Sequence, residues 1–278
     1  MKKILIILAS SLLVFSFTEK KTDPKKEINV LFIGNNLTYL NDMPQILQKM
    51  LNMHEEKYKI SQSTFFNTSL TQHFTNNLTQ TPVGGVSIQP LKEGETSNTE
   101  KLLLSKTWDV VILQDGTLQV LTPEIKTNQV IPTIQNIQKK HKSNVSQFVL
   151  FKTWPNLEAY PKQYCDQKPT QKEKLCTPLM NSIEEECSLI NENYDAVAKA
   201  TDLPSVPVTN CFKDILKNHP NIGLYDGKSQ PSIFAAYLNA CVFFKYITKQ
   251  KASEIKYSAG LDAATVKIIQ DVVDKNYP

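Results

Sequence analysis

Amide and carboxylate side chains near the ends of apolar segments are the residues of this chain best placed for chemistry. Residues 28–39 read INVLFIGNNLTY, so an apolar run stops at Gly34 and Asn36 follows closely. This pattern predicts a buried strand, a tight turn and a helix that begins near Pro44. Ligands bind at the carboxyl ends of the strands in open parallel sheets. The sequence therefore predicts a polar site around Asn36.

Three later segments carry residues of the same kind. Residues 108–115 read WDVVILQD, which predicts a second buried strand that ends at Gln114. Residues 224–232 read LYDGKSQPS and place Asp226 and Gln230 just before a long apolar segment. A Gly84-Gly85 pair marks a turn. Strands alternating with helices predict an α/β fold with a parallel sheet.

In this order the segments resemble the conserved blocks of SGNH (GDSL-type) hydrolases, above all a bacterial exported branch. Residues 32–39, FIGNNLTY, are similar to FIGNSxTY; residues 108–115 are similar to WDxVxLQE; and residues 226–232 are similar to DGxHPS. The resemblance implies a three-layer α/β/α fold with a flavodoxin-like parallel sheet. It also implies that Gly85 lies near the backbone N–H group that binds the oxyanion.

The departures from this resemblance fall on the catalytic residues. Asn36 stands where the family has its nucleophilic Ser, and an amide cannot attack an ester. Gln230 stands at the His position and does not titrate near neutral pH. Asp226 remains, but it precedes Gln230 by four residues where the family spacing is three. We therefore expect a non-catalytic pseudo-hydrolase with former triad positions Asn36, Asp226 and Gln230.

The expected function is ligand binding in the remaining pocket. The resemblance suggests a small ester or an acylated glycan as the ligand, with no cofactor. The residues expected to contact this ligand are Asn36, Gly85, Gln114 and Gln230.

The alternative is an active esterase with a rearranged site. His219 is the histidine closest in sequence to the last block, and Thr38 or Thr117 could supply a hydroxyl. Triads are defined by geometry rather than by chain order. The plain interpretations are that Asn36 is a turn residue, Gln230 a helix-start residue and Ser232 a helix cap.

The N-terminus has the composition of a secretory leader. Lys2 and Lys3 precede an apolar run that extends to Phe17. We expect a signal peptide at 1–18, a linker at 19–26 and the SGNH-like domain at 27–278, with the protein exported to the periplasm or the cell exterior. A single N-terminal membrane anchor is the alternative. No later segment is apolar enough to cross a membrane.

Five cysteines fit an exported protein. Cys165 and Cys176 bracket a polar insert and are expected to form a disulfide, with Cys187 and Cys211 as rival partners. Cys241 is expected to be a buried thiol. No metal-ligand spacing is present, and His54, His73, His141 and His219 are expected at the surface or at helix ends.

The charged residues exclude some partners. All 31 basic residues are Lys and none is Arg, with a formal net charge of +4. Sequence-specific nucleic-acid binding normally uses the planar Arg side chain, so it is not expected. Glu184, Glu185 and Glu186 are expected to form a solvated helix face.

Periodicity and turn residues also predict the order of the elements. Further strands are expected at 57–65, 147–153 and 205–208. Helices are expected at 99–106, 123–142, 178–200, 231–248 and 262–277, and residues 68–79 are expected to be a loop or a weak helix.

Overall fold

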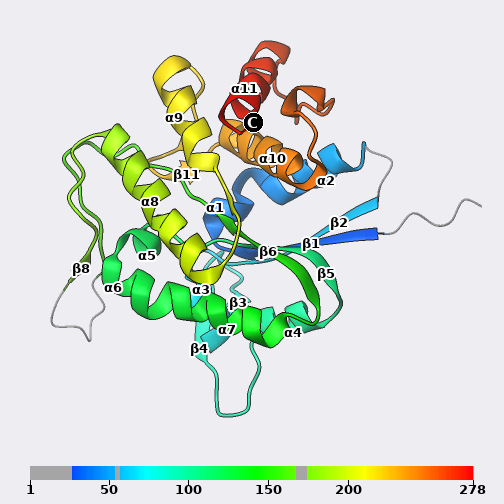
Figure 1. Ribbon diagram of the computed structural model, residues 1–278, viewed down its shortest axis with the longest axis vertical. Coiled ribbons are helices and arrows are strands. Elements are labelled where there is room, and N and C mark those ends of the chain that lie inside the picture. The colour runs from blue at the N-terminus through cyan, green and yellow to red at the C-terminus, as the bar shows by residue number, and fades with distance from the viewer. Residues whose placement is uncertain (1–26, 54–56, 167–173, 278) are drawn as a thin grey trace, which may run out of the picture.

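A parallel sheet of five strands in the order β2-β1-β5-β6-β9 forms the centre of the fold (Figure 1). The computed structural model describes residues 27–53, 57–166 and 174–277, so the expected leader and linker lie outside the described residues. The strands are β1 (Glu27–Gly34), β2 (Lys57–Thr64), β5 (Trp108–Leu113), β6 (Val145–Phe151) and β9 (Ser205–Val206). This order reverses direction between β1 and β5, as in flavodoxin-like folds.

Helices cover both faces of the sheet, because successive side chains of a strand point to opposite faces. Val30 and Phe32 of β1 pack against one layer of helices, and Leu31 and Ile33 pack against the other. The first layer consists of α2 (Met43–Leu51), α9 (Val208–Asn218), α10 (Ile233–Thr248) and α11 (Ala263–Asn276). The second layer consists of α3 (Leu70–Thr75), α4 (Asn98–Leu104), α5 (Thr117–Leu121), α6 (Pro123–Ile125), α7 (Ile131–His141) and α8 (Ile183–Thr201). The three-layer α/β/α architecture expected from the sequence is confirmed.

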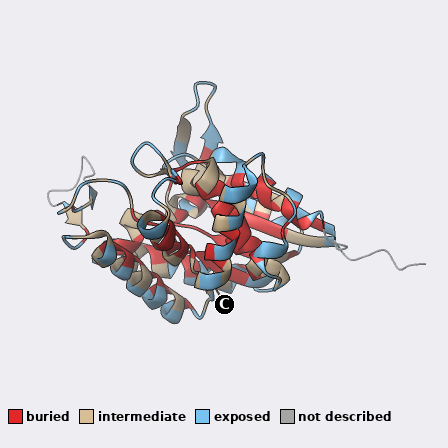
Figure 2. Cartoon of the chain, turned by 90° about the horizontal axis from the view of Figure 1, so that it is seen from above, coloured by how far each residue is buried: buried red, intermediate tan, exposed pale blue. Residues whose placement is uncertain are grey.

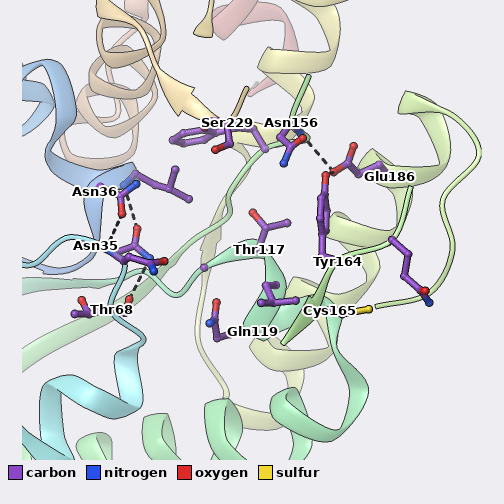
Figure 3. Close-up of a pocket in the computed structure, with 16 residues that line it drawn as sticks. Asn35, Asn36, Thr68, Thr117, Gln119, Asn156, Tyr164, Cys165, Glu186 and Ser229 are labelled. Atoms are coloured by element: carbon purple, nitrogen blue, oxygen red, sulfur yellow. Dashed lines mark hydrogen bonds between the residues drawn. The ribbon is translucent and has the colours of Figure 1, made fainter. Parts of the chain in front are cut away.

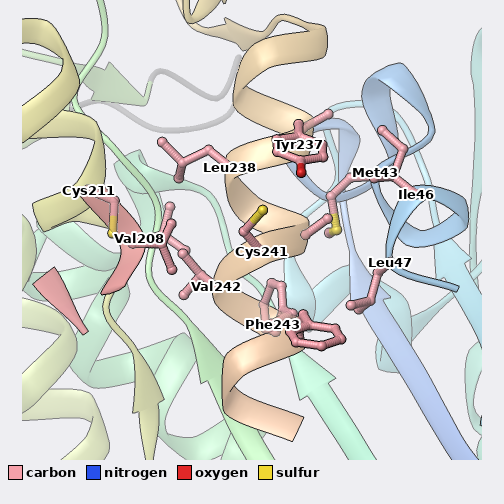
Figure 4. Close-up of a cluster of buried hydrophobic side chains, with 14 of the residues drawn as sticks. Met43, Ile46, Leu47, Val208, Cys211, Tyr237, Leu238, Cys241, Val242 and Phe243 are labelled. Atoms are coloured by element: carbon pink, nitrogen blue, oxygen red, sulfur yellow. The ribbon is translucent and has the colours of Figure 1, made fainter. Parts of the chain in front are cut away.

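Helix α10 is the central element of the first layer. It is apolar on nearly all sides, which is typical of a helix buried all round. Tyr237, Cys241 and Phe243 face Met43 and Leu47 of α2 and the strand β1 (Figure 4). Ser232 caps the helix through its Oγ, which accepts from the N–H groups of Phe234 and Ala235, as expected. Buried residues gather on the inward sides of the helices and along the sheet (Figure 2).

The segment expected as one helix at 123–142 is divided. A π-helical segment (Lys126–Val130) separates α6 from α7. Pro132 lies in the first turn of α7, and proline has no N–H group to donate to the carbonyl four residues earlier. Single π turns of this kind occur within α-helices.

Two further elements differ from the expectation. Residues 68–79 contain α3 and then β3 (Asn76–Gln80), which pairs antiparallel with β4 (Val86–Pro90). Helix α9 was not expected at all.

Among the described helices, none is both long and apolar enough to cross a membrane.

Candidate functional site

A hollow of about 460 Å³ lies at the carboxyl ends of four strands of the sheet (Figure 3). Residues 35–37 after β1, 67–68 after β2, 116–119 after β5, and Trp154 and Asn156 after β6 line it. The far wall is formed by residues 163–165, Glu186 and Ser229. We call this cavity the central hollow. It lies at the point of the sheet where the strand order reverses, which is the usual ligand site of such folds.

The short helix α1 (Asn36–Tyr39) holds Asn36 at the edge of the central hollow. Asn35 caps this helix, and its Oδ1 accepts from the N–H group of Leu37 at 3.0 Å. The Nδ2 of Asn35 donates to the carbonyl of Thr68 at 3.2 Å. Asn36 is half-buried, and its Oδ1 accepts from the N–H group of Asn67 at 2.9 Å. Its Nδ2 has no hydrogen-bond partner among the described residues and is free for a ligand.

Gln114 fixes the turn that carries Asn36. Its Oε1 accepts from the Asn35 N–H group at 2.8 Å and from the Thr38 hydroxyl at 2.9 Å. Its Nε2 donates to the carbonyl of Asp115 at 2.7 Å. A Cβ at Gly34 would come within 2.5 Å of the Gln114 Oε1, so only glycine allows this close approach. Gln114 is fully buried and does not line the central hollow, so the structure gives it a positioning role.

The buried side chain of His73 supports the same turn through a hydrogen bond to the Gly34 carbonyl. The Nε2 of His73 lies 2.9 Å from the Gly34 carbonyl, and its Nδ1 lies 2.9 Å from the Thr99 hydroxyl. Because a carbonyl can only accept, Nε2 carries the proton and Nδ1 accepts from Thr99. Burial lowers the pKa of His73 to about 4, so the ring is neutral at neutral pH. The expectation of a surface position is wrong for His73 and His141, because both side chains are buried, although His141 does lie at the end of α7 as the helix-end alternative expected. His54 lies outside the described residues.

Asp115 is a second buried titratable group at this edge of the sheet. Its Oδ1 accepts from the N–H groups of Leu70 and Gly116 at 3.1 and 2.9 Å, and its Oδ2 has no hydrogen-bond partner among the described residues. Desolvation raises the pKa of Asp115 to about 7 despite these two donors. The carboxyl group is therefore close to half-protonated at neutral pH.

The segment expected to hold the base position is a two-stranded hairpin. Strand β10 (Tyr225–Asp226) pairs with β11 (Gln230–Pro231), and Asp226 lies opposite Gln230. Asp226 is exposed, and its Oδ2 accepts from the Asn41 side chain at 3.0 Å. Neither Asp226 nor Gln230 lines the central hollow, whereas Ser229 does. Ser229 also follows Asp226 by three residues, so by spacing and by position it occupies the place expected for the histidine.

The Gly84-Gly85 turn lies away from the central hollow. Gly85 closes the β3–β4 hairpin, where its carbonyl accepts from the N–H group of Thr81 at 2.8 Å. The loop after β2, and not the Gly84-Gly85 turn, lines the central hollow beside Asn36. The N–H group of Asn67 in this loop donates to the Asn36 side chain. Asn67 adopts a left-handed φ of 51°, which asparagine tolerates well.

A charged cluster supports the opposite wall. Glu186 of α8 is fully buried and forms an ion pair with Lys162 at 2.7 Å. The hydroxyl groups of Tyr160 and Tyr164 donate to the same carboxylate at 2.6 and 3.0 Å. Glu184 is exposed, but the expectation of a solvated face is wrong for Glu186, because residues far along the chain supply its donors.

The cysteine insert completes this wall. Cys165 and Cys176 form a disulfide across β7 (Cys165–Asp166) and β8 (Leu175–Cys176), and Cys165 lines the central hollow. Cys187, Cys211 and Cys241 are free and buried. Within the described ranges, no group of three His, Cys, Asp or Glu side chains is arranged to hold a metal ion.

The alternative nucleophile and base positions lie apart. Thr117 lines the central hollow and donates its hydroxyl to Thr153 at 2.9 Å, and Thr38 is buried against Gln114. His219 ends α9 and lines a separate hollow with α11. No histidine appears among the described residues that line the central hollow.

The sequence prediction missed several lining residues. Asn67, Thr68 and Trp154 follow the ends of β2 and β6. Asn36 was predicted because it closely follows a buried strand, and ligands bind at the carboxyl ends of strands. These lining residues also follow strand ends, so the same argument could have identified them. Glu186 had no such signal, because it follows no strand and its donors come from residues 160–164, which precede it by 22 to 26 positions.

Comparisons with known proteins show the fold. A protein of the DUF4886 family from Bacteroides uniformis ATCC 8492 is 14% identical, with a TM-score of 0.64 over 90% of this chain and 94% of that chain. A candidate SGNH hydrolase from Slackia heliotrinireducens is 18% identical, with a TM-score of 0.52 over 80% and 100%. An alpha/beta hydrolase enzyme from the metagenome of Lake Arreo is 10% identical, with a TM-score of 0.50 over 78% and 93%.

No family model and no curated protein sequence matches the chain. The similarity to these solved structures, at 10–18% sequence identity, shows that the chain has an α/β/α fold like theirs.

Proposed function

We propose that this protein is an exported, non-catalytic SGNH-like protein that binds a small ester or an acylated glycan in the central hollow. The observation that carries the proposal is Asn36 at the end of β1, with its Oδ1 bonded to the Asn67 N–H group at 2.9 Å. The nitrogen lone pair of an amide is delocalised, so Asn36 cannot act as a nucleophile. Its Nδ2 can donate a hydrogen bond to a ligand carbonyl or hydroxyl.

The hairpin that carries the former base position supports the same proposal. A catalytic triad needs a buried Asp that orients a His. Here Asp226 is exposed and bonded to Asn41, and the residue that faces the hollow is Ser229. Loss of either member of a Ser-His pair removes most of the chemical rate.

The lining of the central hollow supports a binding function. Its described lining consists mostly of amide, hydroxyl and aromatic side chains, and the carboxylate of Glu186 there is paired with Lys162. Such groups fix the orientation of an uncharged ligand. The apolar leader supports export as part of the proposal.

An ester hydrolysis assay tests the catalytic part of the proposal. We expect purified wild-type protein to show no turnover of p-nitrophenyl acetate above a buffer control. The variant Asn36→Ser/Ser229→His should gain turnover, and Asn36→Ser/Gln230→His should gain less, because Gln230 does not line the hollow. Clear wild-type turnover that disappears in Thr117→Val or His219→Ala would overturn the proposal and favour an active esterase.

Calorimetry tests the binding part. We expect acetylated monosaccharides to bind the wild type and to bind Asn36→Ala about threefold to tenfold more weakly, the effect of one lost hydrogen bond. Equal affinity for both proteins would place the ligand elsewhere. Mass measurement of the mature protein tests export, with loss of about the first 18 residues expected.

A further inference from the structure

A second hollow of about 480 Å³ adjoins the central hollow. Both are lined by Asn67, Leu118 and Gln119, so these residues form their shared border. The second hollow lies over α3 and the segment that follows α5, and we call it the α3 hollow. Each hollow has the size of a site for a drug-sized ligand, roughly 300–1,000 Å³. We refer to the two adjoining hollows together as the groove.

The α3 hollow is lined almost wholly by uncharged polar side chains. They are Ser69, Thr71, Gln72, Thr75, Asn76 and Gln129. Amide and hydroxyl groups can both donate and accept hydrogen bonds, which matches the hydroxyl groups of a sugar chain. The apolar side chains of Leu118 and Ile125 lie beside them and can contact the C–H faces of sugar rings.

The charges of the groove disfavour an anionic chain. No lysine lines either hollow among the described residues, although Lys is the only basic side chain type in the protein apart from His. The carboxylates that do line the hollows are Asp166 and Glu186. Recognition of uronates or phosphates needs cationic donors, and the described residues of these walls supply none.

Two amide side chains of the groove are free. No described residue forms a hydrogen bond with the side chain of Gln119 at the shared border or with that of Gln129 in the α3 hollow, and both are half-buried. Other polar side chains there already form hydrogen bonds within the protein. Gln72, for example, receives the Ser69 N–H group in a capping box. Figure 3 shows Gln119 on the side of the central hollow toward α3.

We infer that the α3 hollow is a second binding subsite, and that the groove takes a neutral oligosaccharide that extends from Asn36 past Gln119 to Gln129. This inference rests on the proposed function, because it assigns the ligand class of the same site. One sugar unit would occupy the central hollow, and further units would occupy the α3 hollow.

Calorimetry with oligosaccharides of increasing length tests the inference. The probes are neutral xylo-, manno- and cello-oligosaccharides of two and four units, and oligogalacturonates of four units as the anionic comparison. We expect tetramers of one neutral series to bind about tenfold more tightly than its dimers, the gain of one or two further hydrogen bonds. The oligogalacturonates should bind more weakly than this series.

Matched variants separate the two hollows. Gln129→Ala should weaken tetramer binding about threefold to tenfold, the effect of one hydrogen bond, and leave dimer binding unchanged. Gln45→Ala is the control, because Gln45 is exposed on α2 and lines neither hollow. Equal affinities of dimers and tetramers, or no effect of Gln129→Ala, would overturn the inference.

The outcome also distinguishes this inference from the proposed function. Binding of acetylated monosaccharides that depends on Asn36, without any gain from chain length, would retain the proposed function and reject the second subsite. Tighter binding of oligogalacturonates than of every neutral series would overturn the assignment to neutral chains.

Discussion

The two regions expected from the sequence to hold the triad positions, the turn after β1 and the β10–β11 hairpin, differ sharply in the hydrogen bonds that support them. At the end of β1, Asn35 and Gln114 are buried, and their polar groups are bonded within the turn. In the β10–β11 hairpin, Asp226 is exposed and the Gln230 side chain has no hydrogen-bond partner among the described residues. Buried polar groups must be paired, whereas exposed ones can bond to water. The comparison teaches that the bonds of Asn35 and Gln114 hold the turn in place. The side chain at position 36 can therefore change its chemistry and still lie at the central hollow.

The largest expected effect is on the β1 side. Gln114→Leu removes the acceptor of the Asn35 N–H group and of the Thr38 hydroxyl, and it leaves the Asp115 carbonyl without that donor. Each buried group left unpaired costs about 1–3 kcal/mol, so we expect the free energy of unfolding to fall by about 2–5 kcal/mol. Urea denaturation measures this change. A loss below about 0.5 kcal/mol, the range of surface substitutions, would contradict the contrast between the two regions.

The second prediction concerns pH. The pKa of Asp115 is raised to about 7 in the folded state, so its contribution to stability is complete below about pH 4 and is lost as pH rises through 7. The pKa of His73 is lowered to about 4, so its contribution is present above about pH 6.5 and is lost as pH falls through 4. Between these limits the two slopes oppose each other.

Removing one of the two groups reveals the other. In Asp115→Asn, stability should rise with pH between about 4 and 6.5, and the loss near pH 7 should disappear. The difference between wild type and variant should change by about 2–4 kcal/mol from pH 4 to pH 8. Urea denaturation at a series of pH values measures both curves. Parallel curves would show that Asp115 does not titrate in this range.

A smaller effect is expected from the support beneath the turn. Thr99→Val keeps the size of the side chain but removes the hydroxyl that bonds to His73 and to Ser63. We expect a loss of about 1–2 kcal/mol, because one buried acceptor on the ring loses its donor. Thr79→Val, on an exposed residue of β3, serves as the control. An equal change in both variants would argue against the role of His73.

The smallest effect is expected in the hairpin. Asp226→Ala removes one exposed hydrogen bond to Asn41. Its effect on the free energy of unfolding should stay within about 0.5 kcal/mol. Thermal and urea denaturation measure it beside Gln114→Leu. A loss as large as that of the Gln114 variant would mean that both regions are equally constrained.

Strong apolar signals made the central strands and helices predictable. The runs that form β1 and β5 are buried on both faces, which is typical of parallel strands. The π segment was not expected, because the helical spacing of Val130, Ile131, Ile134 and Ile137 was extended back over the polar residues 126–129 to Pro123. Helix α9 has Val208, Phe212 and Ile215 at helical spacing, so its signal was present but not used.

Parts of the site depend on long-range contacts. Asn36 was predicted at the hollow because it directly follows a buried strand, and it lines the hollow. Gln114 follows a strand in the same way, but sequence does not say that its side chain turns back toward Asn35. The same holds for Ser229, whose contact with the hollow depends on the register of a two-stranded hairpin.

Trp154 gives the central hollow an optical signal. The protein contains two tryptophans, and Trp154 lines the hollow, stacks on Phe212 at 4.6 Å and donates its indole N–H group to Ser229. Trp108 is buried elsewhere, with its indole bonded to the Leu103 carbonyl. In a Trp108→Phe background, the emission of a single fluorophore would report events in the hollow. A ligand that displaces water beside this ring would shift its fluorescence, so occupancy could be followed without a label.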